Sequence, residues 1–287
     1  MAVARHRHFG RAAAAVYVTQ PALSQQVRRL EDELGVALLR RTSRGVALTP
    51  AGEDLLVRAE RILAEAVQAR GEMDEHAGVV RGAVRVASTT ADAMRLPEVL
   101  AAFHRQHPAV RLALRQASAA EVLALLRRGA VDLGVLALGA QPADGLAVTP
   151  LGSEPLRAIT GPDDPFPAVV VDLESLRGRP FVLPEPGTAL RQTIMTACQE
   201  HGFSPVPLLE VSDPGTVRFL VNAGLGVSLV PASWLHQPGA PVAVAALLAP
   251  VPEHAVSLLA AGELPPAGRL LAERLADLFG SSAGRLA

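Results

Sequence analysis

A set of polar side chains recurs at helical spacing between residues 19 and 34. Pro21, Ser24, Gln25 and Arg28 fall at positions i, i+3, i+4 and i+7, so a helix would carry them on one face. Serine and glutamine can hydrogen-bond to the edges of bases, and arginine can bridge to guanine or to a phosphate. These side chains at this spacing predict a recognition helix that lies in the major groove of double-stranded DNA.

The limits of this helix are marked in its sequence. Thr19 is a good N-cap, Pro21 is tolerated in the first turn, and Gly35 favours an end after residue 34. The opposite face carries an apolar stripe made of Leu23, Val27, Leu30 and Leu34. An alanine-rich helical segment at residues 10–16 precedes it, and two short helices in this order predict a helix-turn-helix.

A basic turn flanked by two apolar segments follows the helix. Residues 36–39 and 46–48 have the composition of short strands, and the turn between them supplies Arg40, Thr42 and Arg44. Such a hairpin is typical of a wing that contacts phosphates. The sequence therefore predicts a winged helix-turn-helix domain over residues 1–48.

A long helix is expected next, from Pro50 to about Gly78, within a linker of residues 49–80. Its apolar stripe consists of Leu55, Ala59, Ile62, Leu63, Ala66 and Met73. A single helix of this length cannot bury such a stripe by itself, so we expect it to pair with a helix of a second subunit. Packing against its own chain is the alternative, and a dimer or tetramer is the expected assembly.

Charge is unevenly distributed along the chain. Residues 1–48 hold eight arginines and three acidic residues, a net charge of +5, whereas residues 86–287 hold fourteen arginines and eighteen acidic residues, a net charge of −4. A small basic module attached to a larger acidic body is typical of a DNA-binding domain with a sensor domain. An unevenly charged, solvated surface is the alternative that charge alone leaves open.

The motifs of the basic module resemble those of one family. The run TQPALSQQVRRLEDELG at residues 19–35, LRR at 39–41 and LTPAG at 48–52 are similar to the LysR-type transcriptional regulators, and the resemblance covers essentially the whole chain. It implies that four residues approach the bases, namely Gln20, Pro21, Ser24 and Gln25, and that Thr42 and Arg44 lie near phosphates. The complete DNA-binding prediction is Thr19, Gln20, Pro21, Ser24, Gln25, Arg28, Arg40, Thr42 and Arg44.

One feature departs from the family pattern at the N-terminus. Members of the family carry a further helix before the segment that matches residues 9–13, and here only residues 1–8 precede it. Without that helix, the stripe of Leu23, Val27 and Leu30 is expected to be poorly covered. We therefore expect the natural gene product to begin upstream of Met1, and impaired DNA binding is the alternative.

Beyond residue 82, predicted strands alternate with predicted helices. Strands are expected at 83–87, 110–114, 131–136, 181–183, 208–211 and 226–231, and helices at 94–106, 119–128, 190–201 and 216–223. Two βαβαβ sets predict an α/β fold with parallel sheets in two lobes. Lobe I is expected to span 83–160 and about 240–287, and lobe II about 161–239. The family resemblance implies a two-lobed effector domain, 83–287, similar to periplasmic solute-binding proteins.

Hydroxyl-bearing residues follow the predicted strands in both lobes. Ligands of parallel α/β sheets lie beyond the carboxyl ends of the strands, and hydroxyls with free N–H groups at helix N-termini bind anions. The family resemblance places a small effector at the same positions, so we expect an organic anion between the lobes. Helix capping is the alternative explanation for each hydroxyl. The effector set is Ser88, Thr89, Thr90, Ser118, Gly187, Thr188 and Ser212.

Other classes of protein find less support in the sequence. Cys198 lies in the middle of a predicted helix, which indicates a structural thiol rather than a nucleophile, and the eight histidines lack metal-ligand spacing. We therefore expect no enzyme, no metal and no cofactor.

A single cysteine, no export signal and no run of about eighteen apolar residues favour the cytoplasm over a membrane. Double-stranded DNA is the expected partner and RNA polymerase a further candidate. A stand-alone small-ligand-binding protein with impaired DNA binding is the alternative function.

Overall fold

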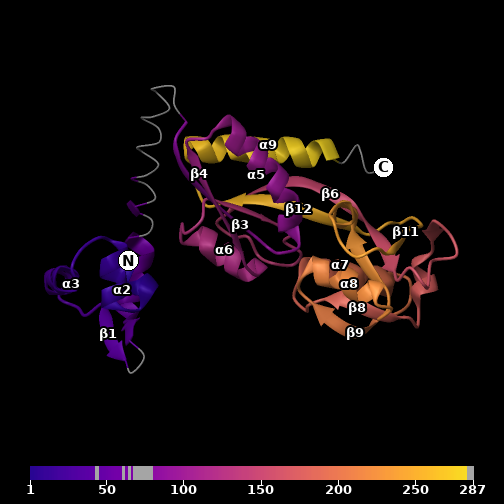
Figure 1. The fold of residues 1–287 in the computed structure, drawn as a ribbon, viewed down its shortest axis with the longest axis horizontal. Helices are drawn as coiled ribbons and strands as arrows, with labels where there is room; N and C mark the ends of the chain where they lie inside the picture. The colour runs from indigo at the N-terminus through magenta and orange to yellow at the C-terminus, as the bar shows by residue number, and fades with distance from the viewer. Residues whose placement is uncertain (43–44, 60–61, 64–65, 67–79, 283–287) are drawn as a thin grey trace. The chain divides into compact units, whose positions relative to one another are not determined.

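The computed structural model describes residues 1–42, 45–59, 62–63, 66 and 80–282. The chain forms two compact units, one made largely of residues 1–70 and the other of most of the rest, and each is described by itself. Figure 1 labels most of the longer helices and strands, numbered in chain order.

The first unit is a small helical domain with a hairpin. Its elements are α1 (Ala2–His6), α2 (Phe9–Ala15), α3 (Gln20–Leu34), β1 (Leu39–Thr42) and β2 (Gly45–Leu48), and residues 50–59 are helical as well. The limits predicted for α3 are confirmed, because the Thr19 hydroxyl accepts a hydrogen bond from the backbone N–H of Ala22 and Gly35 ends the helix with φ +67°. Buried apolar side chains of the described residues are Val3, Ala12, Ala13 and Leu38.

The first strand of the hairpin begins later than predicted. The composition of residues 36–39 indicated a strand there, but β1 starts at Leu39 and pairs with β2 in antiparallel register, Leu39 opposite Leu48. The Glu31 carboxylate on α3 explains the shift, since its Oε1 accepts hydrogen bonds from the backbone N–H groups of Leu38 and Leu39, at 2.7 and 3.0 Å. That contact anchors the start of the hairpin to the end of α3.

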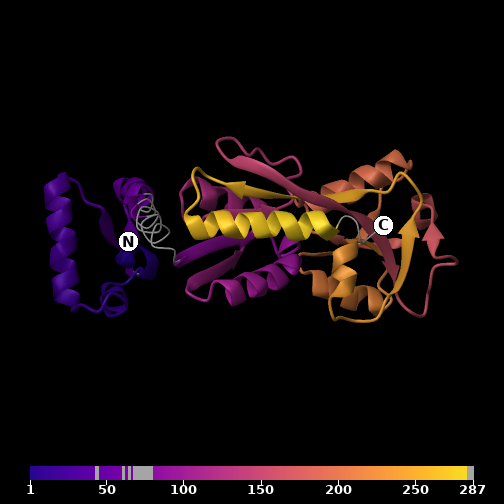
Figure 2. The same cartoon turned by 90° about the horizontal axis from the view of Figure 1, so that it is seen from above.

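Lobe I of the second unit is built on two parallel strand pairs with helices between them. Strand β3 (Gly82–Ser88) pairs in parallel with β4 (Val110–Gln116) and β5 (Leu133–Leu136), as the sequence predicted. The connections are the 3₁₀ helix η1 (Asp92–Arg95) with α5 (Leu96–Gln106), and α6 (Ala119–Arg127). The C-terminal helix α9 (Pro266–Ser282) packs against α5 and β6 (Figure 2).

One long strand runs through both lobes and a second pairs with its first half, and the sequence predicted neither. Strand β6 (Ala147–Thr160) pairs with β12 (Glu253–Ala260) up to Pro155 and with strands of lobe II from residue 156 onward. The lobes therefore share a mixed sheet rather than two parallel ones. The chain enters lobe II near residue 156 and leaves it near residue 252.

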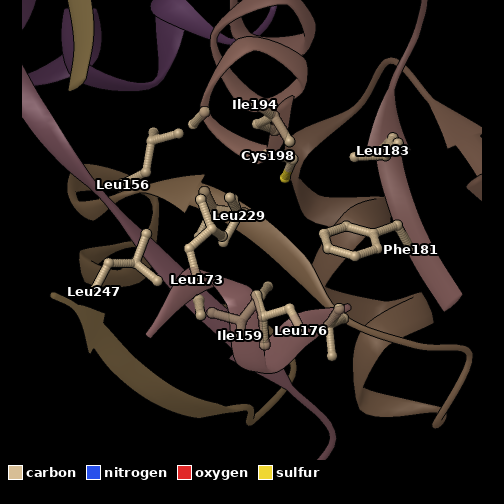
Figure 3. Close-up of a cluster of buried hydrophobic side chains, with 14 of the residues drawn as sticks. Leu156, Ile159, Leu173, Leu176, Phe181, Leu183, Ile194, Cys198, Leu229 and Leu247 are labelled. Atoms are coloured by element: carbon tan, nitrogen blue, oxygen red, sulfur yellow. The ribbon is translucent and has the colours of Figure 1, made fainter. Parts of the chain in front are cut away.

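Lobe II has a parallel pair and an antiparallel extension of β6. Its elements are β7 (Val170–Val171), η2 (Leu173–Leu176), β8 (Pro180–Pro184), α7 (Ala189–Glu200), β9 (Val206–Val211), α8 (Pro214–Asn222), β10 (Ser228–Pro231), η3 (Ala232–His236) and β11 (Ala243–Leu247). Strand β11 lies in this lobe, so the return to lobe I falls later than the expected residue 240. Figure 3 shows the core, in which Phe181, Ile194 and Cys198 are fully buried.

Candidate nucleic-acid interface and effector site

Helix α3 presents its polar face to solvent. Gln20, Pro21, Gln25 and Arg28 are exposed, as is the cap residue Thr19, and Ser24 is half-buried. Two of the three acidic residues near its end are engaged within the domain, since Glu31 holds the hairpin and Glu33 pairs with Arg29 at 3.0 Å. The half of α3 that is free of acidic residues is therefore the half that carries the predicted base-reading side chains.

The hairpin carries the predicted wing residues. Arg40 is exposed, and its Nε lies 3.4 Å from the carbonyl oxygen of Leu48 on the neighbouring strand. Thr42 ends β1, while its side chain and the whole of Arg44 lie outside the described residues. Gly45 has φ +125°, and a Cβ there would be 2.6 Å from the carbonyl oxygen of Arg7, so the approach of β2 to α1 requires glycine.

The hydroxyls after β3 already have partners inside lobe I. Ser88 is fully buried, and its hydroxyl donates to the carbonyl oxygen of Val135 at 2.6 Å. Thr89 donates to the Asp92 carboxylate at 2.5 Å and accepts from the backbone N–H of Asp92 at 3.2 Å. Thr90 is half-buried. Ser88 and Thr89 thus shape this strand end.

The remaining predicted effector residues lie at helix starts. Ser118 is exposed and accepts from the N–H of Glu121 at 3.3 Å, and Thr188 accepts from the N–H of Arg191 at 3.2 Å. These are the capping contacts that the sequence left as an alternative, and the Thr188 hydroxyl in addition donates to the carbonyl oxygen of Glu185 at 2.9 Å. Gly187 has φ +83°. Ser212 is exposed, and Asp213 caps α8 in its place.

A cavity of about 530 Å³ lies between the lobes, and sequence reasoning missed it. Gly139 and Ala140, after β5, line it from lobe I, and Pro252 lines it at the return strand. Helix α7 contributes Ala189, Gln192, Thr193, Thr196, Ala197 and Glu200. None of the predicted effector residues lines this cavity, although Thr188 is adjacent to it in sequence. A polar stripe on α7 was the available signal, but solvated helix faces have the same pattern.

Two groups in this unit have perturbed pKa values because they are buried. Burial raises the pKa of the Cys198 thiol to about 11. Burial also lowers the pKa of the Arg95 guanidinium, which stands 3.9 Å above the ring centroid of Phe279, and the nearby Glu154 carboxylate opposes that shift.

Among the described residues, no group of His, Cys, Asp and Glu could hold a metal ion. In the same part of the chain, no helix is both long and apolar enough to cross a membrane.

The fold and these surfaces define a class of protein: a DNA-binding transcription regulator with a two-lobed effector-binding domain. A family model described as "LysR substrate binding domain" matches residues 77–280, and one described as "Bacterial regulatory helix-turn-helix protein, lysR family" matches residues 1–53. The chain belongs to the LysR family of transcription regulators. The resemblance expected from its sequence is therefore confirmed.

Individual relatives agree with this assignment. The chain is 37% identical over 240 residues to the uncharacterized HTH-type transcriptional regulator YnfL of Escherichia coli K12, a match that covers 82% of this chain and 80% of YnfL. It is 34% identical over 234 residues to E. coli OxyR, a DNA-binding transcriptional dual regulator, covering 81% and 76%. A full-length OxyR variant from Pseudomonas aeruginosa superimposes with a TM-score of 0.75 at 31% identity, over 97% of this chain and 91% of that one.

Proposed function

We propose that this regulator reads its operator with the first half of α3 and the wing. The main support is that Gln20, Gln25 and Arg28 are exposed on α3. The end of this helix is held to the hairpin by hydrogen bonds to Glu31. The proposed base contacts are Gln20, Pro21, Ser24 and Gln25. Thr19, Arg28, Arg40, Thr42 and Arg44 would contact the backbone or adjacent bases.

The division between base-reading and phosphate-contacting residues can be tested on two DNAs. Genome-wide mapping of bound DNA supplies an operator, and a shuffled fragment of equal length is the control. Arg44→Ala should weaken binding to both fragments and lower the slope of affinity against salt by about one. Gln25→Ala should weaken binding to the operator alone. Equal effects of both substitutions on both fragments would contradict this division.

We propose a small organic anion as the effector, held between the lobes at Thr90, Ser118 and Thr188. The surrounding backbone would be shaped by Ser88, Thr89, Gly187 and Ser212. The support is the position of these residues at strand ends and helix starts, where N–H groups favour an anion. Ser118→Ala and Thr188→Ala should weaken effector binding by about 1–3 kcal/mol while DNA affinity without effector is retained. Unchanged affinity in both variants would leave these hydroxyls as helix caps.

We propose self-association through the helix that follows the wing, as a dimer or tetramer. Ile62 and Leu63 in this segment are 64% and 52% exposed in the single chain, which supports a seam with a second subunit. Ile62→Asp should reduce the mass measured by light scattering, since a buried charge destabilises an apolar seam. An unchanged mass would place the seam elsewhere. Binding to RNA polymerase and a cytoplasmic location are further proposals that rest on membership of a family of transcription regulators.

Hydrogen peroxide is a second candidate signal, because several relatives are named hydrogen peroxide-inducible genes activators. The thiol chemistry of this chain opposes it. Cys198 is the single cysteine, is fully buried in lobe II, and has a raised pKa, whereas peroxide-reactive cysteines are accessible thiolates. We therefore propose that no thiol senses peroxide here. Peroxide treatment should leave operator binding of the wild type and of Cys198→Ser equal, and a loss confined to the wild type would contradict this.

A further inference from the structure

A buried carboxylate joins three segments of lobe I where the lobes meet. Asp92 follows β3, and its Oδ2 accepts hydrogen bonds from the Thr89 hydroxyl at 2.5 Å and from the backbone N–H of Ala137 at 3.0 Å. Its Oδ1 lies 2.7 Å from Nε2 of His254 near the start of β12. One side chain thus connects the ends of β3 and β5 to the strand that returns from lobe II.

This pair is costly to bury, which indicates a role beyond packing. The side chains of Asp92 and His254 are 3% and 4% exposed, and Nδ1 of His254 has no hydrogen-bond partner within the described residues. The carboxylate has three hydrogen-bond partners, namely the Thr89 hydroxyl, the Ala137 N–H and Nε2 of His254. Replacing a buried polar pair with apolar residues is often neutral or stabilising, so such a pair contributes more to fixing one arrangement than to stability.

The segment held by Asp92 also makes the contact with lobe II. The indole Nε1 of Trp234, in η3, donates to the carbonyl oxygen of Ala91 at 3.3 Å, and the Gln237 amide donates to that of Met94 at 3.4 Å. These two contacts fall on both sides of Asp92, because Ala91 precedes it and Met94 lies two residues after it in η1.

A second carboxylate completes a closed set of contacts. Glu154 on β6 accepts hydrogen bonds from the backbone N–H and the hydroxyl of Ser233 in η3, at 2.6 and 2.8 Å. Glu154 is also the register partner of His254 across β6 and β12. The contacts therefore lead from Asp92 to His254, across the strand pair to Glu154, through η3, and back to the residue before Asp92.

We propose that Asp92 and His254 are positioning residues of the effector site. Their contact holds the loop of Thr89 and Thr90 in place, and it thereby keeps η1 against η3. Ala137 lies two residues before Gly139 and His254 lies two residues after Pro252, so the segments that the pair joins continue directly into residues that line the cavity. A ligand that moves this loop changes the contact between the lobes through these two side chains. The ligand part of this inference rests on the proposed effector site, but the contact itself can be measured without ligand.

Trp234 provides the measurement. It is the single tryptophan of the chain, it is 4% exposed, and its indole makes the contact with lobe I. Its fluorescence therefore reports the η1–η3 contact in the full-length protein. Acrylamide quenches an indole only as far as it can reach it, so the quenching constant measures opening of this junction.

The experiment compares the wild type with Asp92→Ala, His254→Ala and His254→Gln. His107→Ala is the matched control, because His107 lies in lobe I, packs on Phe103 and follows the C-terminal end of α5, the end away from η1. The first two substitutions should raise the quenching constant about twofold or more by local opening. His254→Gln, which can still donate to Asp92, should restore most of the wild-type value, and the control should not differ from it.

Controls for folding and for the ligand keep the outcomes separate. Far-UV circular dichroism verifies each variant, and Thr89→Ala, which removes one donor to Asp92, replaces any variant that does not fold and should give a smaller rise. Calorimetry with sodium succinate and sodium citrate tests the proposed anion site, and failure of both to bind would count against that site without changing the Trp234 result. The inference would be overturned if the quenching constant of Trp234 were unchanged in every folded variant. It would also be overturned if His254→Gln had as high a quenching constant as His254→Ala.

Discussion

Helices α3 and α7 carry apolar stripes of the same kind but bury them to different extents. None of the fifteen residues of α3 is buried: Leu30 and Leu34 are 42% and 48% exposed, and Leu23 and Val27 are half-buried. In α7, by contrast, Leu190, Ile194, Ala197 and Cys198 are at most 5% exposed. Figure 3 shows Ile194 and Cys198 among the side chains of the lobe II core. Helical spacing of apolar residues therefore predicts that a helix forms, while burial depends on what the rest of the fold supplies to cover it.

The difference has a physical origin in the surroundings of each helix. Strands β8 and β10 and the second half of β6 belong to the same buried cluster as α7 and provide a continuous apolar surface. The first unit buries only Val3, Ala12, Ala13 and Leu38 among its described apolar residues. A domain with so small a core has little apolar surface to offer α3, so its stripe remains accessible.

The largest expected effect is on stability. Ile194→Ala should lower the free energy of unfolding by about 2–5 kcal/mol, because it leaves a cavity in the lobe II core. Leu30→Ala, on the exposed stripe, should cost about 1 kcal/mol or less. Urea denaturation followed by circular dichroism measures both changes. Equal losses would show that the stripe of α3 is covered in solution.

The reaction rate of a cysteine should also differ strongly between the buried stripe of α7 and the exposed stripe of α3. With its pKa raised to about 11, Cys198 forms thiolate only as the pH rises toward that value. A cysteine introduced by Leu30→Cys, in a Cys198→Ala background, should have an ordinary pKa and react with iodoacetamide at about pH 8 roughly a hundredfold faster or more. Mass spectrometry of timed samples gives the rates. Comparable rates would contradict the burial of Cys198.

The polar faces of the two helices should differ in their effect on DNA binding. Gln25 on α3 and Gln192 on α7 are both exposed glutamines. Gln25→Ala should weaken binding to the mapped operator by about 1–3 kcal/mol, since base contacts are lost. Gln192→Ala should leave that affinity unchanged. Fluorescence anisotropy at one fixed salt concentration measures both, and a loss in Gln192→Ala would refute a separate role for the α7 face.

The smallest expected difference is between the two N-caps. Thr188 accepts a hydrogen bond at 3.2 Å and donates one to the carbonyl oxygen of Glu185 at 2.9 Å, whereas Thr19 accepts a single bond at 3.4 Å. Thr188→Ala should cost about 1 kcal/mol, and Thr19→Ala a smaller amount. Thermal unfolding followed by circular dichroism can rank them. The reverse order would mean that capping in α3 is stronger than its geometry implies.

Local signals explain which parts of the fold were predictable. Thr19 and Gly35 delimit α3 correctly because capping and a left-handed stop involve only neighbouring residues. The strands β3, β4 and β5 were recognised from compact apolar runs. Strand β6 was not recognised, because Pro150, Gly152 and Pro155 interrupt its pattern and its pairing comes from β12, about a hundred residues later in the chain.

The sequence by itself determined the family, the limits of α3 and the alternation of strands and helices, since each depends on residues close together in the chain. Only the tertiary structure decided which polar groups meet. Asp92 and His254 are 162 positions apart, and the cavity on α7 exists because residues 139, 140 and 252 reach it from other segments. Long-range pairing of this kind leaves no local periodicity, because the partner of a buried polar group is chosen by topology rather than by its neighbours.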